Sequence, residues 1–548
     1  MANRNARGKA IAKILALVFF ATAAILPAQA QQPGQLVNSS CSSPVQEVAT
    51  NSKHSRAKSL QPSGFAARVD AILGSAPQSK GEWGLLVTDA ATGDVLYQCN
   101  ADRYFLPASN MKLFTTALAL QKLGPDYRFR TTLEADQQPS PDGKLQGSLF
   151  LVGRGDPNLS NRKFPFDLKE EFDGTPEKVI SDLADAVAAK NIKEIAGDIV
   201  GDDSYFPRER YAEGWEIDDM VWEYGAAISA IVVDDNTVTV TLTPGLAAGE
   251  PVAAEALPAT PDFAVNNQVT TSAAGMKADL TLKREPGSNL IEITGTLPAG
   301  SNSKKLILAI QEPALHAAAM LKRLLEARGI KVDGAARSLH LPPGPSPAES
   351  RVVLAEHLSI PLSDSVRLVN KISQNLHAEM LLRTSARQDG PWEKPEDLYK
   401  FPQAFYATAG IPPDDIVQTD GSGLSRHDLI TPRAAVALLT YAQKQSWFPT
   451  YFASLPIAGI DGTLQERLKD TIAAGRIHAK TGSVEHVRTL SGYADLPSGR
   501  RLIFSFLSNN MAGKSHEAGD ALDALTIAMI EEFDKPETPA APKRKAKH

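Results

Sequence analysis

The sequence has 548 residues, 43% of them hydrophobic and 22% charged, with a formal net charge of −6 at pH 7. This length exceeds what one hydrophobic core usually supports, so we expect a globular protein of two or more domains. The acidic balance gives no reason to expect a nucleic-acid partner. Cys41 and Cys99 are the only cysteines. They exclude a multi-cysteine zinc site, and both a disulfide and free thiols remain open.

The first 30 residues have the pattern of a secretory signal peptide. A basic start precedes an apolar run over 14–26, and Ala28-Gln29-Ala30 fits a small-x-small cleavage site. The run is shorter than the roughly 20 residues that a bilayer span needs, which disfavours the alternative of a retained anchor. We therefore expect a periplasmic or otherwise exported protein with at most peripheral membrane contact. Residues 31–62 are rich in Ser, Gln and Asn and are predicted to be a linker.

Strands are expected at both ends of the folded region, with helices in between. Apolar runs between turn residues predict strands at Trp83–Asp89, Val95–Cys99, Arg476–Lys480, Thr489–Ala494 and Leu502–Ser508. Helical spacing of apolar residues predicts helices at Asn110–Leu123, Ala512–Asp534 and in several places between Ser363 and Ala442. This order favours an α+β fold in which one antiparallel sheet, drawn from both chain ends, packs against helices.

The middle of the chain has a different character. Residues 126–345 are rich in turns and β-forming segments, interrupted by a predicted helix at Ala314–Arg328. We interpret them as an insertion of two small lobes into a first domain formed by 63–125 and 346–534. Residues 535–548 are rich in proline and basic residues, which predicts a disordered tail.

Three short motifs occur in order along the chain. Ser109-Asn110-Met111-Lys112 is S-x-x-K, Ser373-Gln374-Asn375 is S-x-N, and Lys480-Thr481-Gly482 is K-T-G. Together they form the set of penicillin-binding proteins and related β-lactamases. S-x-x-K alone is a weak signal because it recurs elsewhere, but only at Ser109 does it open a strongly apolar helix.

The spacing of the first motif suits an activated nucleophile. Residues i and i+3 share one face of a helix, so Ser109 Oγ and Lys112 Nζ can approach each other. A serine hydroxyl needs a base, and a lysine serves as one when burial or a nearby cation such as Lys480 lowers its pKa. A helix N-terminus also offers the Ser109 backbone N–H to an oxyanion.

The other two motifs suit recognition of a peptide that ends in a carboxylate. In extended backbone Ser373 and Asn375 would face the same way, the first to relay a proton and the second to bind a substrate amide. Lys480 and Thr481 would bind the carboxylate, and Gly482 would let a peptide lie against the strand. The backbone N–H of Ser483 is the candidate second oxyanion donor. A D-alanyl-D-alanine end fits such a site.

At these residues the chain resembles the D-alanyl-D-alanine carboxypeptidase/endopeptidase family, the low-molecular-mass class C penicillin-binding proteins. The resemblance runs from about Gly64 to Phe533 and includes the long insertion. It also rests on further matching segments: Pro107–Thr115, Gly155–Leu159, Gly201–Phe206, Asp420–Ser425, Lys480–Ser483 and Leu490–Tyr493. The chain departs from many relatives at Gln374, where they have Asp.

The resemblance implies a transpeptidase-like catalytic domain with inserted domains II and III. It implies a serine peptidase that removes terminal D-Ala from peptidoglycan stem peptides, cuts D-Ala–diaminopimelate cross-links and is acylated by β-lactams. No metal or other cofactor is implied. It also implies that Asp156 lines a subsite for the amine of the stem-peptide side chain. The alternative for Asp156, in Gly155-Asp156-Pro157, is a structural role in a turn.

Two other functions remain as alternatives. A β-lactamase or esterase on the same fold would carry the same motifs, although the long insertion argues against it. A catalytically weak peptidoglycan-binding scaffold is the alternative from another class, and the intact set of Ser109, Lys112, Ser373, Asn375 and Lys480 argues against it.

Overall fold

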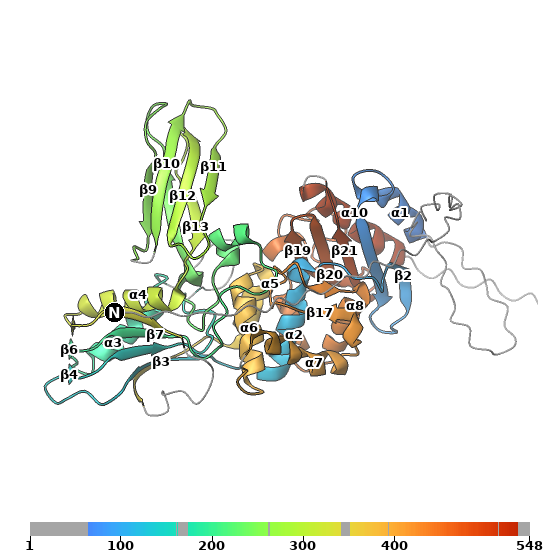
Figure 1. Ribbon diagram of the computed structural model, residues 1–548. Coiled ribbons are helices and arrows are strands. Elements are labelled where there is room, and N and C mark those ends of the chain that lie inside the picture. The colour runs from blue at the N-terminus through green and yellow to red at the C-terminus, as the bar shows by residue number, and fades with distance from the viewer. Residues whose placement is uncertain are drawn as a thin grey trace, which may run out of the picture. The chain divides into compact units, whose positions relative to one another are not determined.

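The computed structural model describes most of the chain that follows the expected linker (Figure 1). The described residues are 64–160, 162, 174–260, 263–340, 351–392, 394–512 and 515–534. The expected signal peptide, linker and basic tail lie outside these ranges, as does Cys41. Cys99 is disulfide-bonded. Within these ranges no helix combines the length and the apolar character that crossing a bilayer requires.

A five-stranded antiparallel sheet joins the two ends of the described chain. From edge to edge its strands are β19 (Ile477–Val484), β20 (Val487–Asp495), β21 (Arg501–Asn509), β1 (Glu82–Asp89) and β2 (Val95–Cys99). In Figure 1 the blue strands of the N-terminal part lie beside the red strands of the C-terminal part. The expected sheet drawn from both chain ends is therefore confirmed, with strand ends shifted by a few residues.

Side chains of this sheet alternate between two hydrophobic clusters, because successive residues of a strand point to opposite faces. Leu85 and Val87 of β1 pack with helices α1 (Gly64–Leu73) and α10 (Ser515–Phe533). Leu86, between them, belongs to the cluster on the other face. Burial on both faces explains why β1 is a continuous apolar run instead of an alternating one.

The second face of the sheet carries the helical part of this domain. Its helices are α2 (Met111–Leu123), α5 (Leu362–Lys371), α6 (Asn375–Arg387), α7 (Pro402–Thr408), α8 (Pro432–Ala442) and α9 (Phe448–Ser454). A short hairpin, β17 (Ile416–Val417) with β18 (Leu429–Ile430), lies between α7 and α8. Helix α2 is buried on every side over its first ten residues. This burial explains its nearly uniform apolar character.

The inserted part contains a second five-stranded sheet. Its order is β15 (Ala336–Leu339), β7 (Ile199–Asp202), β5 (Leu149–Val152), β3 (Arg130–Ala135) and β16 (Val352–Leu358). Helices α3 (Lys178–Ala188) and α4 (Pro313–Glu326) pack on it, and a small sheet of β14 (Lys331–Val332), β6 (Glu194–Ile195) and β4 (Lys144–Leu145) adjoins it. The sequence analysis predicted α4 but not α3.

Strand β16 belongs to a different domain from the one expected. It follows residue 345, where we expected the first domain to resume, yet it pairs antiparallel with β3. Its pairing with β3 makes it an edge strand of the inserted sheet, and the chain returns to the helical part only at α5. The sequence could not reveal this, because strand pairing between distant segments leaves no local signal.

The remaining strands form two three-stranded sheets around a core of their own. One sheet has the order β13 (Lys304–Ala309), β8 (Thr237–Thr243) and β9 (Ala253–Leu257). The other has the order β10 (Ala264–Ser272), β12 (Leu290–Pro298) and β11 (Asp279–Lys283). Val240, Ile291 and Leu308 are fully buried in this core. Strands β8 and β12 correspond to the β-rich stretches expected at 237–243 and 289–295.

Candidate active site

Ser109 lies in a tight turn directly before helix α2. A 3₁₀ turn spans Ala108–Asn110, and α2 begins at Met111. Ala108 has a φ of 45°, a left-handed conformation that a residue with a side chain rarely adopts. Gly423 lies so close to the Ala108 carbonyl that a Cβ there would be 1.8 Å from its oxygen. The turn is thus held from outside in a strained conformation, as is frequent at functional sites.

Lys112 contacts the Ser109 hydroxyl, as the S-x-x-K spacing predicted. Its Nζ lies 2.8 Å from Ser109 Oγ, 2.6 Å from Asn375 Oδ1 and 2.7 Å from the carbonyl oxygen of Ser422. The side chain is fully buried. Burial lowers the pKa of Lys112 to about 7, although the carboxylates of Asp420 and Glu379 oppose the shift. A lysine with this pKa is half deprotonated near neutral pH and can act as a base.

The loop 420–425 completes the surroundings of Lys112. Asp420 accepts hydrogen bonds from the backbone N–H groups of Ser422, Gly423 and Ser425. Burial acts to raise its pKa, but hydrogen bonds, first with the side chain of Asp428 and then from the N–H of Gly423, lower it below its usual value. Glu379 of α6 accepts from the N–H of Gly421 at 2.7 Å. These bonds aim the Ser422 carbonyl at Lys112. In the sequence this segment contributed only to the family resemblance, and its contact with Lys112 was not predicted.

The S-x-N motif reaches the site by a geometry that differs from the expected one. We expected extended backbone, but Ser373 has a φ of 64° and Asn375 is already the first residue of α6. Gln374 caps the helix, since its side chain accepts from the N–H of Leu376 at 2.8 Å. Ser373 and Asn375 still face the two lysines, because the left-handed residue turns the chain sharply before the helix. The expectation of an extended segment was therefore wrong.

Lys480 meets Ser373 across the site. Its Nζ donates to Ser373 Oγ at 2.9 Å and to the carbonyl of Thr481 at 3.0 Å. Burial lowers the pKa of Lys480 strongly, and the neighbouring Lys112 adds to this shift. We expected burial or a neighbouring cation such as Lys480 to lower the pKa of Lys112, and burial is the main cause of the lowered pKa of both lysines.

The K-T-G strand is the edge strand β19. Thr481 Oγ1 lies 2.7 Å from the hydroxyl of Thr463, and Ser483 is exposed at the strand surface. Gly482 is needed for a reason that the sequence did not reveal. A Cβ there would lie 2.1 Å from Thr489 Oγ1 and 2.7 Å from the carbonyl oxygen of Pro107. The absence of a side chain at Gly482 therefore lets the turn that holds Ser109 lie against the strand.

Asn110, the second residue of S-x-x-K, links the turn of Ser109 to strands β19 and β20. Its Nδ2 donates to the carbonyl of Lys480 at 3.0 Å and to Thr489 Oγ1 at 2.7 Å. Thr489 in turn donates to the carbonyl of Pro107 at 2.9 Å. Asn110 is fully buried, so these bonds fix the turn of Ser109 on β19 and β20. The available signal for this role in the sequence was a polar side chain, that of Asn110, directly before the mostly apolar helix.

Asp156 does not join these residues. It is fully buried; its Oδ1 accepts from the N–H of Asn158 at 2.9 Å, and its Oδ2 lies 3.7 Å from His357 Nε2. Burial raises the pKa of Asp156 to about 7. The expected place of Asp156 in a substrate subsite stays a prediction, since Lys480, which we also expect to bind substrate, is equally buried. Its bond to Asn158 two residues on is that of a structural turn.

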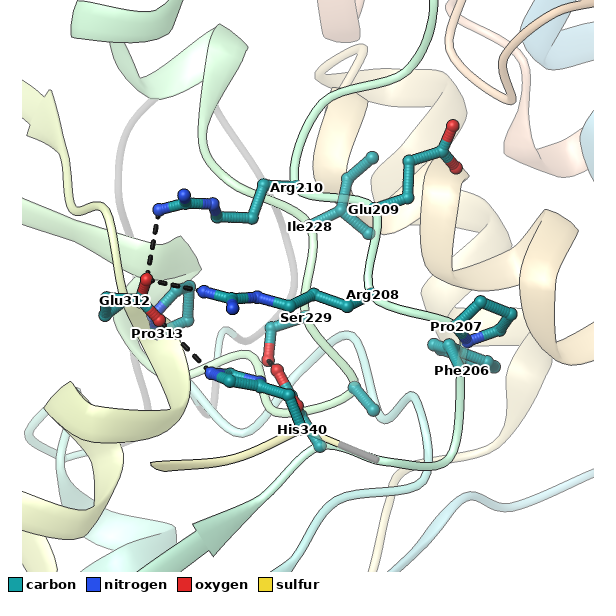
Figure 2. Close-up of a pocket in the computed structure, with 12 residues that line it drawn as sticks. Phe206, Pro207, Arg208, Glu209, Arg210, Ile228, Ser229, Glu312, Pro313 and His340 are labelled. Carbon is teal, nitrogen blue, oxygen red and sulfur yellow. Dashed lines mark hydrogen bonds and ion pairs between the residues drawn. The ribbon is translucent and has the colours of Figure 1, made fainter. Parts of the chain in front are cut away.

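A small polar pocket lies in the inserted part, away from the motifs (Figure 2). Glu312 accepts from Arg208 at 2.8 Å and from Arg210 at 3.0 Å. His340 lies with Nδ1 2.6 Å from Asp203 and with Nε2 3.3 Å from Glu312, and these two carboxylates raise its pKa to about 9. In Figure 2 the side chains of Arg208, Arg210 and His340 point toward Glu312, whereas Glu209 points away from them.

Comparisons with known proteins identify the family of the chain. A family model described as the D-Ala-D-Ala carboxypeptidase 3 (S13) family matches residues 65–529. The D-alanyl-D-alanine carboxypeptidase of Actinomadura sp. (strain R39) is 35% identical over 477 residues, which cover 84% of this chain and 84% of that protein. The D-alanyl-D-alanine carboxypeptidase DacB of Haemophilus influenzae is 27% identical over 468 residues, covering 82% of this chain and 89% of that protein.

A solved structure extends the likeness to the fold. The crystal structure of penicillin binding protein 4 (dacB) from Haemophilus influenzae has a TM-score of 0.74 and 25% sequence identity, covering 85% of this chain and 99% of that chain. The same protein has also been solved in complex with a β-lactam. The expected α+β penicillin-binding fold and the resemblance read from the motifs are thereby confirmed.

Proposed function

The chain belongs to the D-Ala-D-Ala carboxypeptidase 3 (S13) family, and we propose that it is an exported serine peptidase that acts through an acyl-enzyme on Ser109. The substrates are the D-Ala-D-Ala termini of peptidoglycan stem peptides and the D-Ala–diaminopimelate cross-links between them. β-Lactams acylate the same serine. The observation that carries the proposal is the 2.8 Å contact between Ser109 Oγ and a buried lysine whose pKa lies at about 7.

The contacts of Lys112 favour its role as the base. A neutral amine has two N–H groups and one lone pair. The carbonyl oxygens of Asn375 and Ser422 can only accept, so they take the two N–H groups. The lone pair is left for the Ser109 hydroxyl, which is the one partner of the three that can donate a proton.

Acylation then proceeds as follows. Lys112 takes the proton of Ser109 Oγ as this oxygen bonds to the carbonyl carbon of the penultimate D-Ala. The backbone N–H groups of Ser109 and Ser483 bind the resulting oxyanion. The C–N bond breaks as the proton held by Lys112 passes to the leaving nitrogen by way of the Ser373 hydroxyl, which accepts a hydrogen bond from Lys480. Lys112 is then neutral again and Lys480 stays protonated. Water later releases the acyl group, again with Lys112 as base.

Recognition of the substrate uses the edge strand β19. The substrate backbone pairs with the edge of the strand, and its terminal carboxylate binds Lys480 and Thr481. A carboxylate beside Lys480 raises the pKa of this lysine, because an opposite charge favours the charged form. Substrate binding thus supplies the ammonium group that burial alone disfavours.

The test is incubation of the purified protein with muropeptides, followed by mass analysis. The parent should release terminal D-Ala from pentapeptides and convert cross-linked dimers to monomers, while Ser109→Ala should do neither. Peptide mapping should place the penicillin adduct on Ser109 and N-terminal analysis of exported protein should find Gln31 first. An adduct on another serine would refute the assignment, and rapid turnover of the adduct would favour a β-lactamase.

A further inference from the structure

A carboxylate of the insertion reaches the S-x-N segment of the catalytic site. Asp235 Oδ2 accepts from Gln374 Nε2 at 3.2 Å, and Asp235 Oδ1 lies 2.9 Å from His377 Nε2. Since a carboxylate only accepts, His377 donates from this nitrogen. Gln374 and His377 lie on either side of Asn375. The Asp235 side chain therefore contacts Gln374 and His377, which come before and after Asn375 in the chain. Asn375 is itself a hydrogen-bond partner of Lys112.

Asp235 is itself fixed from several directions. It forms an ion pair with Arg162, and its Oδ1 accepts from Ser160 Oγ at 3.2 Å. Ser160 Oγ in turn accepts from the backbone N–H of Asp235 at 3.0 Å. Burial acts to raise the pKa of this carboxylate, yet Arg162, His377 and Gln374 hold it well below its usual range. It is a permanent, shielded negative charge.

The backbone on both sides of this contact is strained. Asp234, Asp235 and Asn236 are three consecutive left-handed residues, with φ of 52°, 48° and 57°, and Ser373 has a φ of 64°. Residues with side chains seldom adopt this conformation, and such strain persists only where the surroundings enforce it. Asn236 is secured by a bond from its Nδ2 to the carbonyl of Ala227 at 2.9 Å. The two strained segments meet at Asp235 and Gln374.

We propose that Asp235 is a positioning residue whose carboxylate, through Gln374 and His377, holds Ser373 and Asn375 against Lys480 and Lys112. The inference rests on the proposed function, since it gives the insertion a part in acylation. A second contact also joins the insertion to the S-x-N segment: Asn375 Nδ2 donates to the carbonyl of Tyr224 at 2.8 Å. The insertion therefore completes the S-x-N geometry.

Replacing Gln374 by Asp is a specific test, because we expect it to slow acylation only by placing a second carboxylate beside Asp235. Asp is a good N-cap residue, so α6 should keep its cap. Its carboxylate would, however, lie beside that of Asp235 in a buried site. The charged or titratable groups that already face Asp235 are Arg162 and His377. Two carboxylates there would share a proton, so one of the two would have a raised pKa.

The measurement is the second-order rate of acylation by a fluorescent penicillin between pH 6 and 9, for parent and variants. Gln374→Asp should acylate at least about tenfold more slowly, with the deficit growing as pH rises. Asp235→Asn combined with Gln374→Asp should recover to within about threefold of the parent, because one charge is removed. Gln388→Asp adds the same charge to the exposed end of the same helix and should have no effect.

A second readout is hydrogen exchange of the backbone amides of residues 373–376. Gln374→Ala introduces no charge and should increase this exchange and slow acylation, while the global unfolding transition stays near that of the parent. If Gln374→Ala and Gln374→Asp match the parent in both readouts, or if the double variant is no better than Gln374→Asp, the positioning role is refuted. If the parent itself takes up no penicillin but exchange rises in the variants, the proposed function fails while Asp235 still holds the segment.

Discussion

Asn110, next to the nucleophile, donates to the backbone carbonyl of Lys480 at 3.0 Å. This bond joins the first motif to the last, across most of the length of the chain. It places the Ser109 turn on the edge strand that also carries Lys480 and Thr481, the residues proposed to bind the substrate carboxylate. The site is thus held by contacts between its own motifs as well as by the scaffold around them.

Gly482→Ala should abolish most acylation. The added Cβ would meet Thr489 and the Pro107 carbonyl, both of which hold the Ser109 turn, so that the nucleophile must shift. A displacement of about 1 Å typically costs on the order of 10²-fold in rate. Stopped-flow acylation by penicillin measures this effect. Gly519→Ala, in the open surroundings of α10, is the matched control and should acylate normally. Normal acylation by Gly482→Ala would show that the glycine serves only the substrate.

Acylation should depend on pH through Lys112. Burial lowers the pKa of this lysine to about 7, so the neutral base is lost as pH falls below that value. The second-order rate should therefore fall about tenfold per pH unit well below pH 7 and be nearly flat above it. Lys112→Ala should lose 10²–10⁴-fold or more across the whole range. A profile that keeps rising to pH 10 would exclude a lysine of lowered pKa as the base.

Lys480→Ala should impair peptides that end in a free carboxylate more than it impairs peptides with an amidated end. A charge-assisted hydrogen bond contributes about 1.5–3 kcal/mol, which corresponds to roughly 10–150-fold in kcat/KM. The comparison uses a matched pair of D-Ala-D-Ala peptides. The same loss on both substrates would mean that Lys480 acts only through Ser373.

Asp156→Asn should stabilise the fold at neutral pH and leave catalysis unchanged. The folded-state pKa of Asp156 is raised to about 7 from a usual value of 3.8. Between these values the folded state holds more protons than the unfolded state, so stability falls as pH rises from 3.8 to 7. The variant lacks this loss and should gain on the order of 1 kcal/mol in unfolding free energy at pH 8.

Denaturant unfolding of Asp156→Asn at pH 4 and pH 8 measures the effect, which should be absent at the lower pH. Peptides with a free and with an acetylated side-chain amine should be cleaved at the parental rates. A selective loss on the free amine would instead support the subsite role.

The motifs and the sheet were predictable because their signals are local. S-x-x-K needs one helical turn, and the strands of the central sheet are apolar runs between turn residues. The backbone of Ser373 was not predictable, because its left-handed conformation comes from contacts with Lys480 and the insertion. Strand β16 was misplaced for the same reason, since only its pairing with β3 assigns it to the inserted sheet.

Residues that act through others gave the weakest signals. Asp235 has no motif around it, and its relation to Gln374 appears only when two segments 139 positions apart meet. Asp156 shows a related difficulty. The resemblance suggested that it lines a substrate subsite and the Gly155-Asp156-Pro157 pattern suggested a turn, and its full burial in the structure could not be foreseen from either. Burial of a polar residue is decided by packing and cannot be read from its neighbours in sequence.

The pairing of β1 with β21 has a consequence for biosynthesis. A ribosome makes β1 and Ser109 early and β19 to β21 near the end of the described chain. At about 5–20 residues per second, roughly 20–70 s separate Ser109 from Lys480. During that time β1 lacks its partner β21, and the backbone groups along that edge of the strand are free to pair with another chain. A nascent chain that lacks β19 has neither Lys480 nor Ser483, to which the proposed mechanism assigns the substrate carboxylate and the oxyanion, so we expect it to be inactive until this strand is made.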